Sequence, residues 1–463
     1  MNTETKLPFL TRIAFGSGDL AQNLIYQTIS IYLLLFYTNV YGLAPAAAAG
    51  LFLAVRLVDV AWDPLVGAFV DKHTPKLGKY RSYLLYGGIP LAALSVASFW
   101  TGFAPSLAYA AATYGILSMI YTLVNVPYGA LNASLSRETD EIVSLTSIRM
   151  VMANLGGLAV GSGVPYLVTK LSPDHSMKSP ASAPAWLLTM ALFAVVGLLL
   201  LVFCFARCKE RVTMSAQAAS KVKVSDLWME FVRNRPLRII AFFFITSFAM
   251  LSVGNAAGSY FLIYNLKAES QLPLFMALGS APAFVLLPLL PVFKKLVGKI
   301  GVFYWSLGLG IVGFAALYAF SKFAAGPARL WGVMGAQLVK SAGILVATGY
   351  MWALVPEVIG YGELKSGRRI AGIVNALTGI FYKAGMALGG VVPGLVLAAT
   401  GFVAPSETVH DPVQTATALE GILWIMCVIP AALLVLATFI ISRYELDDAT
   451  MARVNAELEN RHE

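Results

Sequence analysis

Apolar stretches of membrane length recur along the whole 463-residue chain. A helix needs about 20 mostly apolar residues to cross the hydrocarbon core of a bilayer. The sequence contains twelve such stretches, at 13–40, 46–70, 83–103, 107–135, 147–169, 185–206, 239–266, 271–293, 301–321, 327–356, 370–400 and 417–442. Only 12% of the residues are charged, against about 25% in soluble domains, which excludes a large soluble helical protein. The sequence therefore predicts an all-α integral membrane protein with twelve transmembrane helices.

The longest polar interruption lies between the sixth and seventh stretches. It predicts an N-terminal six-helix bundle, a cytoplasmic central loop, a C-terminal six-helix bundle and a cytoplasmic tail, at 1–207, 208–238, 239–442 and 443–463. A basic, glycine-bearing turn follows both the second and the eighth stretch, which indicates two related halves. Transporters built from parallel halves bind their substrate near the midplane of the membrane.

The distribution of basic residues predicts the orientation of the chain. When the N-terminus is placed in the cytoplasm, 24 Lys and Arg residues fall in inside segments and 5 in outside segments. Both termini are therefore expected on the cytoplasmic side of the cell (inner) membrane. The net charge of +9 lies largely in short loops beside the membrane, so we expect contact with membrane lipid and no nucleic-acid partner. The sequence does not predict an oligomeric state.

Acidic residues are rare within the expected spans, where a charge costs about 2.5–3.5 kcal/mol on insertion scales. Asp59 and Asp63 are four residues apart, on one face of the second helix, and Arg56 precedes Asp59 by three. A carboxylate pair of this kind suits a Na⁺ site or a protonatable pair. The alternative is a structural salt-bridge cluster with Arg56 that holds helices together.

Polar side chains along the first and fourth helices predict the lining of a cavity. They are Asp19, Gln22, Asn23 and Tyr26 in the first helix, and Thr122, Asn125 and Tyr128 in the fourth. Amides, hydroxyls and carboxylates bind hydroxyl-rich ligands such as a small glycoside. Hydrogen bonds between helices are the alternative role for the residues of the fourth helix.

Three basic residues lie inside later spans without an acidic residue nearby in their own helix: Arg149, Lys340 and Lys383. Arg149 and Lys383 need carboxylates from elsewhere or a ligand rich in acceptors. Lys340 either belongs with Arg56 to a charge network or reaches the outside water by snorkelling.

Several motifs together resemble one transporter family. They are FGSGDLAQN (15–23), DPLVGAFVDKHTPKLGKYR (63–81), YTLVNVPYGAL (121–131), WALVPEVIGYGELKSGRR (352–369) and KAGMALGG (383–390). The chain resembles the glycoside–pentoside–hexuronide:cation symporters of the major facilitator superfamily, which include melibiose, glucuronide and xyloside carriers. The resemblance implies the major facilitator fold and import of a glycoside with H⁺, Na⁺ or Li⁺ by alternating access. It implies no enzyme activity and no cofactor besides the coupling ion.

The resemblance also implies roles for individual residues. Asp59 and Asp63 match the family's cation-binding carboxylates and Thr122 the hydroxyl beside them. The positions that match polar groups around the sugar and the coupling network are Tyr121, Arg149 and Lys383.

Three positions depart from the melibiose carriers. Asn23 and Asn125 stand where those carriers have sugar-binding aspartates, and Trp62 replaces an asparagine near the cation. The tryptophan favours H⁺ over Na⁺. A pocket that has lost two carboxylates favours an anionic sugar such as a glucuronide, with neutral glycosides and pentosides as the alternative.

The basic turn after the second helix predicts a cytoplasmic gate. The residues assigned to it are Asp71, Lys72, Arg81, Glu357 and Arg369. Loop 70–81 is expected to dock near Glu357 and the segment 363–369 when the inside is closed.

Other classes of membrane protein fit the sequence less well. An ATP-driven pump lacks support because the sequence has no G-x-x-x-x-G-K-[ST] loop, and a membrane enzyme lacks it because there is no G-x-S-x-G or H-E-x-x-H motif. An uncoupled sugar facilitator stays open as the alternative, followed by a non-transport receptor.

Overall fold

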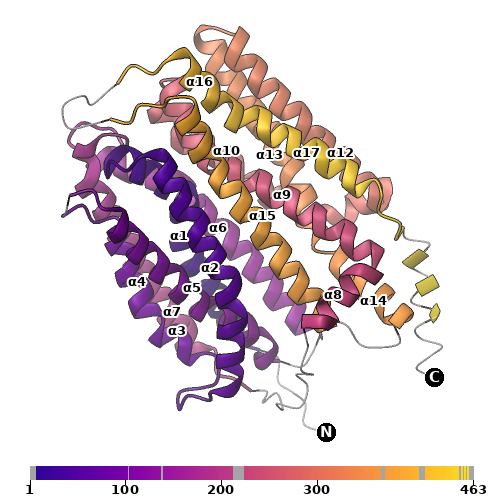
Figure 1. Cartoon of the computed structure of the whole chain (residues 1–463). Coiled ribbons are helices and arrows are strands. Elements are labelled where there is room, and N and C mark those ends of the chain that lie inside the picture. The colour runs from indigo at the N-terminus through magenta and orange to yellow at the C-terminus, as the bar shows by residue number, and fades with distance from the viewer. Residues whose placement is uncertain are drawn as a thin grey trace. The chain divides into compact units, whose positions relative to one another are not determined.

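The structure is a computed structural model that describes residues 7–102, 104–136, 139–211, 224–366, 371–405, 412–447, 450–451, 453–454 and 456–457. Across these residues the chain forms helices joined by short connections, without a strand (Figure 1). Nine helical segments of the described chain are long and apolar enough to cross a membrane. The prediction of an all-α membrane fold is confirmed.

The chain divides into two compact units. Unit 1 comprises Met1–Ala218, Lys267–Ala277 and Leu397–Ala418, and unit 2 comprises Ala219–Leu266, Leu278–Val396 and Leu419–Glu463. Two short segments of the second predicted half thus belong to unit 1. The hydroxyl of Ser162, for example, donates to the carbonyl of Pro273 at 3.0 Å. The division into two six-helix halves around 208–238 stays a prediction.

Unit 1 contains the helices that carry the expected cation site. Their bounds are α1 Phe9–Leu35, η1 Phe36–Val40, α2 Pro45–Lys72, α3 Ser82–Tyr86, α4 Gly88–Ala97, α5 Leu107–Leu135, α6 Thr139–Leu171, η2 Pro180–Ser182, α7 Ala183–Arg207 and η5 Glu269–Gln271.

Unit 2 contains most of the later helices. Their bounds are α8 Val224–Arg233, α9 Arg235–Tyr260, η4 Phe261–Asn265, α11 Pro282–Leu286, α12 Leu290–Phe323, α13 Gly326–Met351, α14 Leu354–Ser366, η6 Trp424–Val428 and α17 Ile429–Ile441. Three further helices contribute residues to both units: α10 Leu272–Ser280, α15 Ala371–Ala399 and α16 Ala416–Leu423.

Three expected spans are not single long apolar helices. The third is interrupted at Gly87, between α3 and α4, and the eighth is divided into α10 and α11 before Pro282. Proline at the start of α11 cannot continue the hydrogen bonding of a preceding helix. The first span is one long helix, α1, but glutamine and asparagine side chains lower its hydropathy. It is therefore not among the nine helical segments that are apolar enough to cross a membrane.

The basic turn expected between the eighth and ninth stretches coincides with a kink in α12, where two helical segments meet. One residue, Gly298, departs from helical geometry, with φ of +71°. Glycine adopts this conformation without the steric cost that a Cβ imposes. The chain therefore bends at a single residue, and Lys299 immediately after the bend is buried.

In unit 1, α1 packs closely against α6 and α7. Gly156 of α6 permits one close approach, because a Cβ there would lie 2.7 Å from Cβ of Asn23. This packing brings the polar stripe of α1 against α6.

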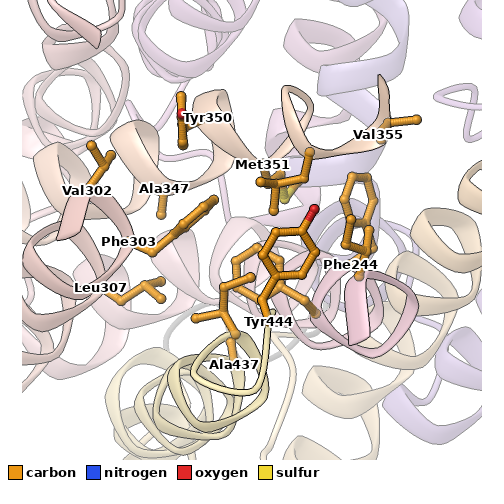
Figure 2. Packing of buried hydrophobic residues seen from close by; sticks show 14 of the residues in the cluster. Phe244, Val302, Phe303, Leu307, Ala347, Tyr350, Met351, Val355, Ala437 and Tyr444 are labelled. Atoms are coloured by element: carbon orange, nitrogen blue, oxygen red, sulfur yellow. The ribbon is translucent and has the colours of Figure 1, made fainter. Parts of the chain in front are cut away.

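The apolar core of unit 2 gathers side chains from several of its helices (Figure 2). Phe303 of α12 packs against Tyr350 of α13 with ring centroids 5.4 Å apart. Leu434 and Ala437 of α17 join the same cluster. Figure 2 places Tyr444, which follows α17, beside this core.

Candidate functional site

Two carboxylates of α2 face two hydroxyls of α5. The hydroxyl of Ser118 donates to the carboxylate of Asp59, at 2.7 Å and 2.8 Å from its two oxygens. The hydroxyl of Thr122 donates to the carboxylate of Asp63 at 3.1 Å. Asp59 and Asp63 are four residues apart on α2, and Ser118 and Thr122 are four residues apart on α5. One face of α2 therefore lies along one face of α5. The structure thus brings together the three residues predicted for the cation.

Arg56 lies at the edge of this site. Its guanidinium is 3.4 Å from Asp59 and sits over the ring of Tyr26, 5.6 Å from the centroid. Tyr26 in turn stacks on Tyr121, with centroids 5.2 Å apart. A structural salt-bridge cluster, the alternative to a cation site, requires this contact with Asp59. At 3.4 Å it is longer than a close charge-assisted hydrogen bond of about 2.7–2.9 Å.

Trp62 lies between Asp59 and Asp63 in sequence, and its indole N–H donates to the carbonyl of Met119 at 3.1 Å. An indole nitrogen is a donor only. The side chain therefore links α2 to α5 and cannot supply a ligand to a metal cation.

A second polar cluster joins α1 to α6. The guanidinium of Arg149 donates to the carboxylate of Asp19 at 2.7 Å. The amide of Asn23 donates to the same carboxylate at 3.3 Å, and Gln27 donates to Asn23 at 3.3 Å. Sequence reasoning left the partner of Arg149 open, and the structure provides Asp19. The polar groups along this face of α1 therefore form one hydrogen-bonded chain.

Two predicted site residues are fully buried. Gln22 donates to the carbonyl of Gly18 at 3.1 Å, whereas the neighbouring Asn23 is half-buried. Tyr128 is also fully buried, and its hydroxyl donates to the carbonyl of Phe15 at 2.6 Å. Its ring lies below the guanidinium of Arg149, 5.0 Å from the centroid. Tyr128 therefore supports Arg149 and has its hydroxyl engaged within the protein.

Two other predicted residues are half-buried. Asn125 lies three residues after Thr122 on α5, and Lys383 lies on α15 in unit 2.

Lys340 does not reach the outside water, and that alternative is wrong. Its side chain is buried in α13, with the ammonium over the ring of Phe314 at 5.3 Å. Gly313 of α12 lies directly against its backbone, where an added Cβ would be 2.4 Å from Cα of Lys340. The close crossing of α12 and α13 places Lys340 in the packed interior of unit 2.

Glu357, predicted for the gate, has partners inside unit 2. The buried ammonium of Lys299 lies 2.8 Å from its carboxylate and also donates to the carbonyl of Leu446 at 2.7 Å. The hydroxyl of Tyr444 donates to the same carboxylate at 3.2 Å. Burial, together with the nearby negative charge of Glu357, raises the pKa of Tyr444. The cluster holds the segment after α17 against α12 and α14.

The structure describes only some of the other predicted gate residues. Lys72 ends α2 and is exposed. The side chain of Asp71 and all of Arg369 lie outside the described residues. Arg81 lies over the ring of Phe205 at 5.2 Å. The gate stays a prediction.

The sequence did not lead us to two residues that contact predicted site or gate residues, Ser118 and Glu210. Ser118 precedes Thr122 by four residues, and the matching spacing of Asp59 and Asp63 was a usable signal. Glu210 accepts hydrogen bonds from the backbone N–H groups of Lys79, Tyr80 and Arg81 at 2.7–3.0 Å. No local sequence pattern predicts this contact, because about 130 residues separate Glu210 from Tyr80.

A family model described as MFS/sugar transport protein matches residues 14–448. The chain belongs to this family. Within the major facilitator superfamily it belongs to the glycoside–pentoside–hexuronide:cation symporters, the branch that its motifs resemble. The family predicted from the sequence is confirmed.

Three curated relatives match this sugar transporter along nearly its whole length. It is 43% identical to the uncharacterized symporter YnaJ of Bacillus subtilis, covering 98% of this chain and 96% of the relative. It is 28% identical to a glucuronide carrier protein homolog of Escherichia coli, covering 98% and 96%. It is 29% identical to an isoprimeverose transporter of Lactiplantibacillus pentosus, covering 98% and 92%.

Solved structures support the fold. The nucleoside transporter NupG superimposes with a TM-score of 0.67 at 12% identity, covering 94% of this chain and 100% of that one. At this identity the likeness concerns the fold alone.

Proposed function

We propose that this protein is a secondary active transporter that imports a small glycoside together with H⁺ or Na⁺. The observation that carries the proposal is the pairing of Asp59 with Ser118 and of Asp63 with Thr122 between α2 and α5. Carboxylates inside a membrane span are costly unless they serve a function or meet a partner. The family and the symporter name of its relative YnaJ support coupling to a cation.

The coupling follows from charge. An ion or proton at Asp59 and Asp63 neutralises carboxylates that otherwise lie in a poorly solvated site. Binding of the ion and of the sugar then strengthen each other by the same factor, because linkage between two sites is reciprocal. The loaded carrier changes the side on which it is open and releases both ligands in the cytoplasm.

Protons suit this site better than sodium. Sodium needs several oxygen ligands at once, and the indole of Trp62 supplies a donor at the position next to Asp63. The hydroxyl of Ser118 and the guanidinium of Arg56 already occupy Asp59. A proton binds a single carboxylate oxygen and needs no further ligands, and Na⁺ is the alternative that the ion panel below tests.

The cluster of Asp19, Asn23 and Arg149 is our proposed sugar site, with Tyr26, Tyr121 and Asn125 as further contacts. A role for Lys383 stays a prediction from the resemblance. A carboxylate beside a guanidinium offers paired acceptors and donors to sugar hydroxyls. An anionic sugar would instead compete with Asp19 for Arg149. The names of the relatives include both a glucuronide carrier homolog and an isoprimeverose transporter, so both substrate classes belong in the test.

The experiment is uptake into proteoliposomes, with a glucuronide and a neutral glycoside, under an imposed proton or sodium gradient. We expect accumulation above equilibrium with one of the two ions. Asp59→Asn and Asp63→Asn are expected to keep expression and to lose accumulation. Full accumulation in both variants would refute the coupling role. Equal, gradient-independent uptake in the unmodified protein would establish an uncoupled facilitator.

A further inference from the structure

The short helix α8 presents an apolar face that the described chain leaves partly exposed. Trp228, Met229 and Val232 lie on this face, at positions i, i+1 and i+4, and are 67%, 44% and 46% exposed. On the neighbouring face, Phe231 packs against Phe381 of α15 with ring centroids 5.5 Å apart. One face of α8 is thus fixed to the protein, and the adjacent one is left open.

The connection to α9 fixes the level of α8. One residue, Asn234, separates the end of α8 from Arg235, where a membrane-length span begins (Figure 1). The side chain of Asn234 accepts from the backbone N–H of Leu237 at 3.1 Å and donates to the carbonyl of Val358 at 3.4 Å. Because one residue joins the two helices and its side chain is bonded to α9 and α14, α8 is held close to the start of the membrane-length span.

Basic residues mark the same junction. Arg233 ends α8 and is exposed, and Arg238 follows in the first turns of α9. Arg235 is paired with Glu445 at 2.6 Å. Tryptophan favours the headgroup level of a bilayer, and Lys and Arg near the surface attract the anionic lipids of the cytoplasmic leaflet. An apolar face beside a basic edge is the arrangement of an interfacial amphipathic helix.

We propose that α8 lies in the cytoplasmic surface of the membrane, inserting Trp228, Met229 and Val232 among the acyl chains near the headgroups. Arg233 binds the headgroup of an anionic phospholipid there. This inference needs the membrane fold and its predicted orientation, and it does not depend on the sugar or the ion that the protein carries.

The test uses the full chain with Met229→Cys, labelled with an environment-sensitive fluorophore after reconstitution. The three native cysteines are buried, so the label goes to the introduced thiol. Val413→Cys is the control, because Val413 is 93% exposed in a segment outside the helices. Lipids with a quencher near the headgroup end of the acyl chain report insertion, in phosphatidylcholine vesicles with and without phosphatidylglycerol.

We expect quenching at position 229 to exceed that at position 413 by about threefold, and to increase with phosphatidylglycerol. Arg233→Gln is expected to remove the increase with phosphatidylglycerol while leaving transport and protein yield unchanged. If Met229→Cys does not fold, Val232→Cys reports on the same face.

Two results would overturn the proposal. An unquenched label at both 229 and 232 would mean that protein or water covers this face. Quenching that changes neither with phosphatidylglycerol nor with Arg233→Gln would show that an anionic lipid is not the ligand of Arg233.

Discussion

At the residue scale, the ion pairs of this transporter differ in how far their side chains are buried. The ammonium of Lys299 has a side-chain exposure of 1% and contacts both Glu357 and a backbone carbonyl. Lys322 and Glu420 also form a pair, but their side chains are 43% and 36% exposed. Water screens exposed pairs, whereas removing one partner of a buried pair strands the other charge.

We expect Lys299→Met to lower the free energy of unfolding by about 3 kcal/mol, the low end for a broken buried pair, since Glu357 keeps some contact with water. Lys322→Met is the control and is expected to change stability little. Denaturant titration in detergent measures both. Equal losses in the two variants would contradict the argument from burial.

At the element scale, the crossing of α12 and α13 depends on glycines that have no room for a side chain. A Cβ at Gly313 would lie 2.4 Å from backbone atoms of Lys340, and one at Gly343 would lie 2.3 Å from the carbonyl of Ser306. Backbone atoms cannot rotate away, so relief requires the helices to separate. Gly308, on the same helix α12, meets nothing within 4 Å.

Gly313→Ala is therefore expected to destabilise the protein by about 1–3 kcal/mol, the usual range for overpacking. Gly308→Ala is the matched control and is expected to be neutral or stabilising, because alanine favours a helix by about 1 kcal/mol over glycine. Thermal midpoints in detergent compare the two. A stable Gly313→Ala variant would show that the crossing is looser than described.

The segment around η5 contacts the loop after α6 through the carboxylate of Glu269. Glu269 accepts from the backbone N–H of Met177 and from the hydroxyl of Ser176 at 3.0 Å. Burial raises the pKa of Glu269 above its ordinary value of 4.5, although these hydrogen bonds oppose the shift. The folded state therefore favours the protonated carboxyl.

A carboxyl whose pKa is raised on folding contributes stability at pH below its unfolded value, and loses it as pH rises through the folded value. We expect the thermal midpoint of the unmodified protein to fall more than that of Glu269→Gln when pH is raised from 4.5 toward neutrality. Parallel pH profiles of the two proteins would rule this contact out as the source of the dependence.

At the scale of the whole molecule, the first helix of each predicted half ends in the same way. A five-residue π-helical turn follows α1, at Phe36–Val40, and another follows α9, at Phe261–Asn265. Such turns are rare within helices. Their matching places fit the predicted duplication. A third π-helical turn, at Trp424–Val428 before α17, has no counterpart in α7.

The orientation that the basic residues predict is open to a direct test. Lys209→Cys, after α7, is expected to be shielded from a membrane-impermeant maleimide in intact cells, and Ala325→Cys, between α12 and α13, to be labelled. Both positions are exposed. The positive-inside rule gives this result because basic loops stay in the cytoplasm. The reverse labelling pattern would invert the topology and with it the predicted gate.

The sequence by itself determined the class of fold, the family and the pairing of Asp59 with Asp63 on one face. These depend on hydropathy and on spacing within one helix, which are local properties of the chain. Only the tertiary structure decided which charges meet. Asp19 and Arg149 are 130 residues apart, and Lys299 and Glu357 are 58 apart, so no periodicity connects them. The tertiary structure also decided that Gln22, Tyr128 and Lys340 are buried. Close packing of neighbouring helices fixes which side of each helix is buried.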